Sequence, residues 1–387
     1  TISNYGISSD VQYGTPTNGI SIPVLLNNIA NPDLTWETTE QVNFGIDFSV
    51  LDDRISGTID FYDKKTKDLL QNIPIPTSSG YSNILINKGD ISNKGIELAM
   101  NFDLISNDDF EFSFGGNIAF NQTKLESLGV PADDFYIDGV AEQRSFFFGN
   151  NISRGQIFQS PANVFVEGEE TSLFYGFETD GIYQSDDTDL VDGAVPGDPR
   201  IIDQNGDGVI DDLDRTFIGN PNPDFIYGFN LNFRYKRFNA SLLFNGVHGN
   251  DIANGNLLTI GNATGQFQNV LSDSYYNAWR PDAPSNIHPR IGYNTVGDTA
   301  ITDRIIEDGS FLRLNNITIG YDFPVDNLSI FDRFNLFITA QNLFVWTDYS
   351  GYNPEISSFS YDGLRNGVDW NGSPDAKNIS IGLNLNF

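Results

Sequence analysis

The chain has 387 residues, no cysteine, 52 acidic against 21 basic side chains, and a formal net charge of −31 at pH 7. This charge excludes nucleic acid as a partner, because binding to phosphates needs a basic surface. The absence of cysteine excludes disulfides, thiol catalysis and thiolate metal sites. The 31 Phe and 37 Gly favour strands and turns, so we expect an all-β protein.

Alternating apolar residues predict four pairs of long strands, each joined by a short turn. In chain order the pairs cover 42–50 with 55–61, 96–104 with 110–120, 225–235 with 238–244, and 317–323 with 334–340. A further strand closes the chain, KNISIGLNLNF at 377–387. One of its faces is apolar and the other is polar and uncharged. This pattern is typical of a strand between hydrocarbon and a polar interior, although a half-buried strand of a soluble sheet alternates in the same way.

Long polar stretches separate these pairs, at 64–93, 122–173, 185–223, 247–305 and 345–376. Short and long connections therefore alternate, as in outer-membrane barrels with short periplasmic turns and long outer loops. With the C-terminus on the periplasmic side, all the tight turns are expected on that side. Further strands are expected at 172–184 and 274–280. The total is about a dozen strands of roughly ten residues, which is long enough to cross hydrocarbon at a tilt.

Aromatic residues in the predicted loops allow two interpretations. Trp346 and Tyr349 follow a strand that runs outward, where an interface girdle of aromatic rings would lie, and ordinary loop packing is the alternative. Trp279, Tyr361 and Trp370 are candidates for stacking on sugars. Interface anchoring is the commoner use of such rings.

Several long segments resemble one known family. They include NPDLTWETTEQVNFGIDFSVLDDRISGTIDFYDKKTKDLL at 31–70, NKGIELAMNFDL at 93–104, FYGFETDGIYQSDD at 174–187, DGSFLRLNNITIGYDFP at 308–324 and FITAQNLFVWTDYSGYNPE at 337–355. In this order they resemble the barrel region of SusC/RagA-type TonB-dependent outer-membrane transporters of Bacteroidota. The terminal strand that ends at Phe387 then resembles the signal read by the barrel assembly machinery.

The resemblance implies an antiparallel transmembrane β-barrel of 22 strands in the outer membrane of a Gram-negative bacterium. Residues 1–387 would be its C-terminal part, with the plug domain outside this chain. It also implies a SusD-like surface lipoprotein as a lid, energy supplied through TonB, ExbB and ExbD, and a possible dimer of SusC/SusD pairs. Because an open sheet edge is not tolerated in lipid, we expect another segment to complete the barrel.

The stretch DQNGDGVIDDLD at 203–214 matches the twelve-residue calcium loop. Gly208 allows the sharp turn, and Asp214 replaces the usual Glu, so the affinity is expected to be modest. Because the loop precedes a strand that runs inward from Phe225, it is expected outside the cell, with a structural role. A turn rich in Asp and Gly is the alternative. The expected Ca²⁺ ligands are Asp203, Asn205, Asp207, Val209 through its carbonyl, Asp211 and Asp214.

Catalytic patterns are weak in this sequence. The two histidines, His248 and His288, lack a second His at metal spacing, and the nucleophile elbow G-x-S-x-G is absent. Pairs such as Asp133–Asp134 and Glu169–Glu170 imitate a glycosidase dyad, but chance pairs are expected among 52 acidic residues. We therefore predict no enzyme activity and assign no catalytic, cofactor-binding or substrate-binding residue.

Three functions remain open on the sequence. The leading one is energised import of oligosaccharides or oligopeptides, with the substrate class taken from the resemblance. The second is a non-transporting structural or assembly component built on the same barrel. The third is a soluble calcium-binding β-module, which would bury its apolar strand faces between packed sheets.

Overall fold

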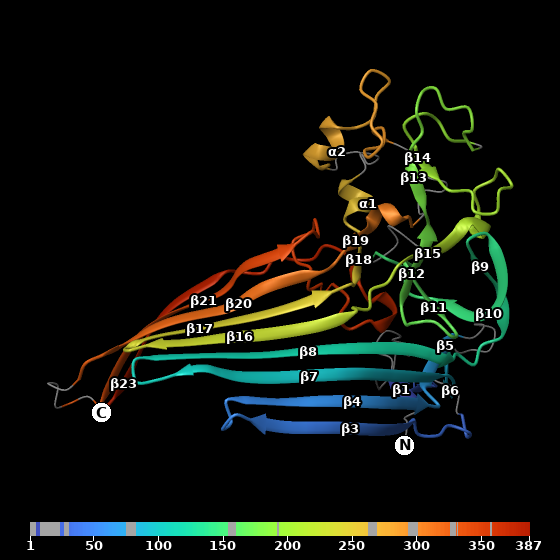
Figure 1. The fold of residues 1–387 in the computed structure, drawn as a ribbon. Coiled ribbons are helices and arrows are strands. Elements are labelled where there is room, and N and C mark those ends of the chain that lie inside the picture. The colour runs from blue at the N-terminus through green and yellow to red at the C-terminus, as the bar shows by residue number, and fades with distance from the viewer. Residues whose placement is uncertain are drawn as a thin grey trace, which may run out of the picture.

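The computed structural model consists of a sheet of long strands with a head of loops and short strands at one end (Figure 1). The residues described are 5–7, 24–26, 31–74, 83–153, 160–191, 193–261, 269–292, 301–325, 330, 332–356 and 358–387. Among them, no helix is long and apolar enough to cross a membrane.

Nine antiparallel strands form the main sheet, in the order β23-β21-β20-β17-β16-β8-β7-β4-β3. They are β3 (Thr38–Val50), β4 (Ile55–Lys67), β7 (Asp90–Ser106), β8 (Phe110–Ser127), β16 (Phe225–Tyr235), β17 (Phe238–His248), β20 (Phe311–Phe323), β21 (Arg333–Thr347) and β23 (Asn378–Asn386). All four predicted strand pairs and the closing strand are confirmed. The expected total of about a dozen is too high for this sheet.

The two faces of the main sheet differ in polarity. Phe44, Phe61, Ile96 and Phe120 lie side by side on four neighbouring strands, with 65, 44, 49 and 45% of their surface exposed. The opposite face carries rows of small polar residues, for example Ser241, Thr318, Thr339 and Ser380. An exposed apolar face of this extent fits a wall in contact with lipid. It does not fit the soluble alternative, in which these side chains would be buried.

Short and long connections lie at opposite ends of the sheet. The turns at 51–54, 107–109 and 236–237 lie at the left end in Figure 1, where the C-terminus also lies. The head and the long connections lie at the other end. The predicted alternation of short turns and long loops is therefore confirmed, and the three short turns that the structure describes completely share one side.

Both edges of the main sheet are open. Among the described residues, β3 pairs only with β4, and β23 pairs only with β21. Nearly every residue of these two strands is exposed on both faces. Backbone groups on the outer side of each edge strand therefore lack a partner strand, which a membrane wall must supply.

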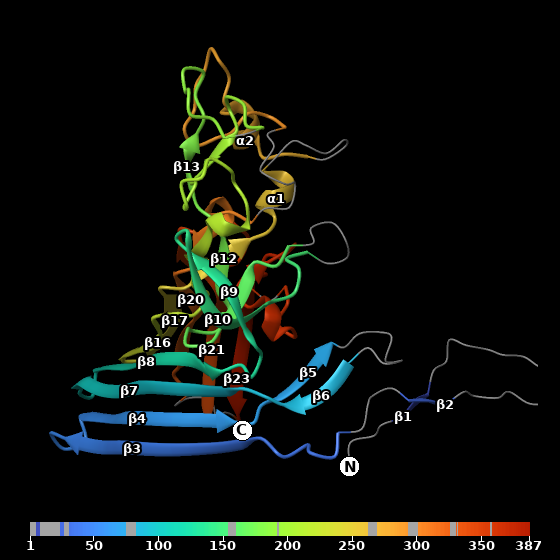
Figure 2. The ribbon, with the colours of Figure 1, turned by 90° about the vertical axis from the view of Figure 1, so that its right-hand side faces the viewer.

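The head contains the smaller sheets and two short helices (Figure 2). A five-stranded sheet has the order β15-β12-β11-β10-β9, β13 pairs with β14, and β18 lies between β19 and β22. The bounds are β9 (Ala132–Ile137), β10 (Val140–Phe148), β11 (Asn163–Val166), β12 (Leu173–Phe177), β13 (Thr179–Ile182), β14 (Pro199–Ile201), β15 (Arg215–Gly219), β18 (Asp251–Asn254), β19 (Ile306–Asp308), β22 (Val368–Asp369), α1 (Leu257–Ile260) and α2 (Ser272–Tyr276). Two further hairpins are β1 (Tyr5–Ile7) with β2 (Val24–Leu26), and β5 (Leu70–Pro74) with β6 (Asn83–Asn87).

Two expectations for the long stretches need correction. The strand expected at 172–184 forms as β12 and β13, but both pair within the head, because β12 is buried on both faces. The strand expected at 274–280 is wrong, because residues 272–276 form α2. Asp273 in the first turn of this helix favours a helix N-terminus, because its negative charge complements the helix dipole.

The apolar core of the protein lies in the head. Its largest cluster joins segments distant in sequence, and its buried members are Ile152, Ala162, Phe174, Ala253, Ile301, Ile305, Phe359, Val368 and Trp370. A second cluster packs Phe135 against Val164, Val166 and Tyr175. The head is therefore folded like a water-soluble domain, while the main sheet presents its apolar side chains outward.

A substitution on each face tests which side contacts lipid. Ile338 lies on the apolar face of β21, between Ile319 and Ile381, and Gln341 lies on the polar face of the same strand. In lipid vesicles we expect Ile338→Arg to lower the free energy of unfolding of the intact protein by about 2–4 kcal/mol. The matched control, Gln341→Arg, should change it by less than about 1 kcal/mol. Equal losses in both variants would contradict the assignment of the faces.

Candidate functional site

Two long loops meet in the sheet formed by β19, β18 and β22. Asp251 pairs with Asp308, and Ala253 and Asn254 pair in parallel with Val368 and Asp369. The two ends of the loop between β17 and β20 and the loop that follows β21 are thereby joined at the head end of the main sheet. The head surface is thus built from segments more than 100 residues apart, and its geometry depends on how these loops are held.

Tyr349 fixes the loop after β21 from inside. Its hydroxyl donates to Asp369 Oδ2 over 2.7 Å, and Ser358 Oγ donates to Oδ1 of the same carboxylate over 3.0 Å. Burial and the carboxylate together raise the pKa of Tyr349 above its usual value, so the hydroxyl remains a donor. Of the two interpretations given for these aromatic residues, loop packing is correct for Tyr349, and the interface girdle stays a prediction for Trp346. Trp346 is half exposed beside Phe344, but Tyr349 is 5% exposed.

Arg313 attaches the same loop to the main sheet. It lies on β20 beside Asn245, on the polar face, and its side chain is 3% exposed. Its Nη2 lies 2.8 Å from Glu355 Oε2, and its Nη1 lies 2.5 Å from Asp375 Oδ2. Nη2 also donates to Asn353 Oδ1 over 2.6 Å. These contacts hold the loop between β21 and β23 over the polar face of the sheet.

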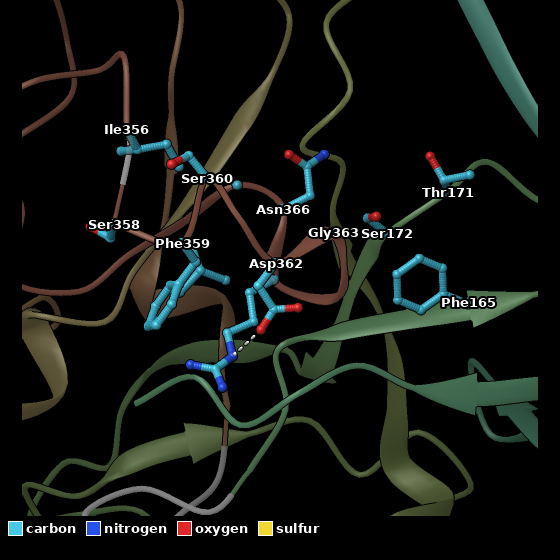
Figure 3. A pocket seen from close by; sticks show the side chains of 13 residues that line it. Phe165, Thr171, Ser172, Ile356, Ser358, Phe359, Ser360, Asp362, Gly363 and Asn366 are labelled. Atoms are coloured by element: carbon cyan, nitrogen blue, oxygen red, sulfur yellow. Dashed lines mark ion pairs between the residues drawn. The ribbon is translucent and has the colours of Figure 1, made fainter. Parts of the chain in front are cut away.

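A cavity of about 340 Å³, here named the loop pocket, lies between this loop and the turn before β12 (Figure 3). Phe165, Thr171 and Ser172 line one side of it, and residues 356, 358–360, 362, 363 and 365–368 line the other. Arg365 and Asp362 form an ion pair of 3.1 Å in its lining. The Arg365 guanidinium lies 4.3 Å above the Phe359 ring. No sequence motif indicated this pocket.

The aromatic side chains proposed for sugar stacking lie in different environments. Trp279 is 7% exposed and donates from Nε1 to Gln184 Oε1 over 3.0 Å. Trp370 is 8% exposed and belongs to the main core cluster. Tyr361, by contrast, is 74% exposed. The two tryptophans are therefore packing residues, and only the tyrosine presents a ring to solvent.

The candidates that the sequence analysis set aside have structural contacts. His288 Nε2 lies 3.3 Å from Asp273 Oδ2, and the His248 ring lies 4.9 Å from that of Phe225. Glu169 pairs with Arg144, and Glu170 accepts a hydrogen bond from Asn220 over 2.7 Å. Gln143 donates to Asp134, the neighbour of Asp133 in the other carboxylate pair. None of these contacts assembles an acid–base pair around a cavity.

The predicted calcium loop lies between β14 and β15, at the head end. Asp203 accepts hydrogen bonds from Gly206 N and Gly208 N, both over 2.7 Å, and Gly206 and Gly208 have φ values of 75° and 84°. Asp214 is fully buried and accepts from Gln204 N and Asp211 N. The chain therefore curls around these two carboxylates, the first and last positions of the motif.

The donor set of this loop consists of hard oxygens. The hydrogen bonds from backbone N–H groups, first that of Gly208, lower the pKa of Asp203, so it is ionised at neutral pH. Asp207 accepts from Val209 N over 2.8 Å, and Asp211 caps the short helix at 212–214. In the described part of the chain, no three His, Cys, Asp or Glu side chains converge as a metal-binding group. The ligand types fit Ca²⁺, but their side chains point to the backbone of the loop.

Comparison with known proteins gives a consistent result. A family model described as TonB dependent receptor-like, beta-barrel matches residues 3–343. TonB-dependent receptor P3 of Formosa agariphila is 34% identical, over 94% of this chain and 35% of that protein. TonB-dependent receptor SusC of Bacteroides thetaiotaomicron is 29% identical, over 92% of this chain and 32% of that protein. The chain thus spans about a third of the length of these relatives.

A solved structure has the same fold. The structure of the RagAB peptide transporter superposes with a TM-score of 0.75 and 22% sequence identity. The match covers 99% of this chain and 38% of the other. At this identity the likeness concerns the arrangement of strands and head, which agree over nearly the whole chain.

The Arg313 contacts give a stability prediction. We expect Arg313→Met to lower the free energy of unfolding by about 2–4 kcal/mol, because the substitution leaves two carboxylates without their cation. The loss in the free energy of unfolding should be smaller than that for a fully buried ion pair, since Glu355 and Asp375 keep contact with water. The control is Arg333→Met, whose pair with Asp322 is exposed and should matter by less than about 1 kcal/mol.

Thermal unfolding of the intact protein measures both variants. Hydrogen exchange at residues 353–356 and 358–375 adds a local readout, which should accelerate only in Arg313→Met. Unchanged exchange in that variant would show that Arg313 does not hold the loop.

Proposed function

We propose that this chain, which belongs to the TonB-dependent receptor-like β-barrel family and is of the SusC/RagA type, forms part of the wall of an importer for bulky nutrients. The family is located in the outer membrane of Gram-negative bacteria. The observation that carries the proposal is the exposed apolar face of the nine-stranded sheet, opposite a polar face over which Arg313 holds the loop between β21 and β23. Such a wall separates lipid from a polar passage.

The open edges support a larger barrel. A sheet edge with unpaired N–H and C=O groups is too costly in hydrocarbon, so β3 and β23 require neighbours beyond the nine strands. We propose that these strands and a plug domain belong to the rest of a polypeptide of which this chain is the C-terminal part. The share of each relative that the chain covers, about a third, supports this.

The partners follow from the relatives by analogy. The structures of the RagAB peptide importer are described in closed-closed and open-open states. We propose a SusD-like surface lipoprotein as a lid over the head, a dimer of such pairs, and energy from TonB, ExbB and ExbD through the plug. The substrate class is oligosaccharide or oligopeptide. A non-transporting component of an outer-membrane complex is the alternative, and a test of uptake separates the two.

The importer proposal predicts loss of uptake. In the source bacterium, deletion of the complete gene should abolish uptake of one class of fluorescent oligosaccharides or oligopeptides, and the gene in trans should restore it. An uncoupler that dissipates the proton gradient should have the same effect on the wild type. Normal uptake of both classes in the deletion strain would contradict import. Uptake that is lost on gene deletion but continues in the wild type in the presence of the uncoupler would contradict a role for TonB.

We also propose that the loop at 203–214 holds a structural Ca²⁺. The support is its pattern of hard oxygen donors, its two left-handed glycines and the ionised state of Asp203. When bound, the ion supplies positive charge that neutralises carboxylates of the loop. Asp203, Asn205, Asp207, Asp211 and Asp214 would hold it together with the Val209 carbonyl. Its effect would be to fix the connection between β14 and β15 outside the cell.

Calcium binding predicts a shift in stability. At millimolar Ca²⁺ we expect a gain of about 1 kcal/mol in the free energy of unfolding of the wild type, as for an extracellular-grade site. Asp203→Ala should abolish this gain. Asp212→Ala should keep it, because that carboxylate in the same loop is 82% exposed and pairs with Arg215. Equal responses of the two variants would contradict the site.

The pH dependence has a defined sign. The pKa of Asp203 is lower in the folded protein than in the unfolded chain. Its contribution to stability is therefore present above the usual carboxyl range and is lost as the pH falls through the folded pKa. In calcium-free buffer, the stability difference between the wild type and Asp203→Ala should shrink as the pH falls from 7 into this acid range. A difference that grows would contradict the assignment.

A further inference from the structure

We propose that the outward side of strands β4, β7 and β8 binds a lipid of the outer leaflet whose headgroup carries a phosphate monoester. Lys65, Lys94 and Lys124 hold the phosphate, and the exposed apolar row below them holds the acyl chains. This inference goes beyond the importer proposal and takes from it only the orientation of the sheet, with the head outside the cell. It is carried by the distribution of the lysines, the register of the three strands and the apolar row beneath.

Lysines are concentrated at one place in this acidic chain. Of its eight lysines, six lie between residues 64 and 124, at or near the head ends of β4, β7 and β8, which lie at the right in Figure 1. Strand alternation puts four of the six on the apolar, outward face: Lys65, Lys67, Lys94 and Lys124. The strands β16, β17, β20, β21 and β23 are described from end to end and carry no Lys or Arg on that face. The positive charge on the lipid side of the described sheet is therefore local.

The strand register brings three of these lysines together. Lys65 on β4 and Lys124 on β8 both lie opposite Ser92 of β7, so they are two strands apart, which is about 10 Å. Lys94 lies two residues further along β7 on the same face, about 7 Å from that row. Because a lysine ammonium is carried on a long, flexible stem, all three can reach one anion.

Protein carboxylates hold these lysines only weakly. Lys94 Nζ lies 3.1 Å from Asp63 Oδ2, and Lys65 Nζ lies 3.8 Å from Asp90 Oδ2. The two lysine side chains are 56 and 40% exposed, and ion pairs this exposed contribute little to stability. Within the described ranges, Lys124 takes part in no ion pair. The three ammonium groups are therefore available to a more highly charged anion.

The surface for the acyl chains begins in the next row of the same strands. Phe61, Ile96 and Phe120 lie side by side on β4, β7 and β8, and each is about half exposed. This row is one row from Lys94 and two rows from Lys65 and Lys124, on the side away from the head. Lysines at such an edge lay their stems along hydrocarbon and extend the charge toward the headgroups. One lipid molecule can thus contact both parts of the site.

A phosphate monoester fits this arrangement better than a diester. Near neutral pH a monoester carries a charge of about −1.5 to −2 and three acceptor oxygens, so each ammonium group can take one oxygen. A phosphodiester carries a single charge on two such oxygens. Basic residues beside a membrane-embedded surface bind anionic headgroups in this way.

Lipid binding to the complete receptor tests the proposal. Native mass spectrometry in a neutral detergent would compare three dioleoyl lipids with the same chains: phosphatidic acid with a monoester, phosphatidylglycerol with a diester, and diacylglycerol with no phosphate. We expect phosphatidic acid to bind about tenfold more tightly than diacylglycerol, with phosphatidylglycerol between them. Equal binding of phosphatidic acid and diacylglycerol would overturn the proposal. Millimolar inorganic phosphate should not displace phosphatidic acid, and displacement would show a site for a free anion instead of a lipid.

A triple variant locates the site. Lys65→Gln, Lys94→Gln and Lys124→Gln together should remove the preference for phosphatidic acid, while the melting temperature is kept because the lost ion pairs are exposed. Arginine at the same three positions keeps the charge and should keep the preference. A preference that survives in the glutamine variant would overturn the assignment.

A matched control separates the site from the total charge. The variant with Lys64→Gln, Lys236→Gln and Lys377→Gln loses the same three charges, from the inner face of β4, the turn at 236–237 and the residue before β23. It should bind phosphatidic acid like the wild type, and an equal loss in both triple variants would overturn the site. These outcomes are distinct from those of the uptake test. Loss of the lipid preference leaves import standing, and normal uptake in the deletion strain leaves the lipid site standing.

Discussion

The requirement that every backbone N–H and C=O in hydrocarbon find a partner governs this structure. It explains why the main sheet is an unbroken ladder of nine strands whose neighbours in space are also neighbours along the chain. It also explains why apolar and polar side chains lie on different faces of the sheet. Because the ladder satisfies the backbone hydrogen bonds, one face of each strand is free to be apolar. Rows such as Phe44–Phe61–Ile96–Phe120 are then exposed without cost in lipid. The head, outside hydrocarbon, follows the rules of soluble proteins and buries its apolar residues.

The strands of the main sheet could be predicted because their signal is local. An alternation with period two and a turn such as Leu51–Arg54 lie within about 20 residues of each other. The head could not be predicted in this way, because its pairings join distant segments, for example Ala253 with Val368. Tyr349 illustrates the limit. Its sequence position indicates an interface ring, and only the fold brings Asp369 to its hydroxyl and buries it.

The two candidate sites differ in the same respect, namely whether their residues are contiguous in the sequence. The loop at 203–214 is a contiguous motif, so its ligand positions could be read directly, and the structure adds how Asp203 and Asp214 hold the backbone. The loop pocket has no motif at all. Its walls meet through Asn163, whose role as a bridge between Ser172 and Asn366 depends on two backbone carbonyls, and no side-chain pattern encodes such contacts.

The long insertion between β8 and β16 divides the main sheet into two meanders of four and five strands. Within each meander, the longest link between paired strands is shorter than this insertion, which carries much of the head. Bringing Ile226 opposite Ala119 closes a loop of over 100 residues, and the entropy lost in closing a loop grows with its length. The pairing of β8 with β16 is therefore the slow step in forming the sheet. Contacts that compact the intervening head shorten the effective loop and speed its closure.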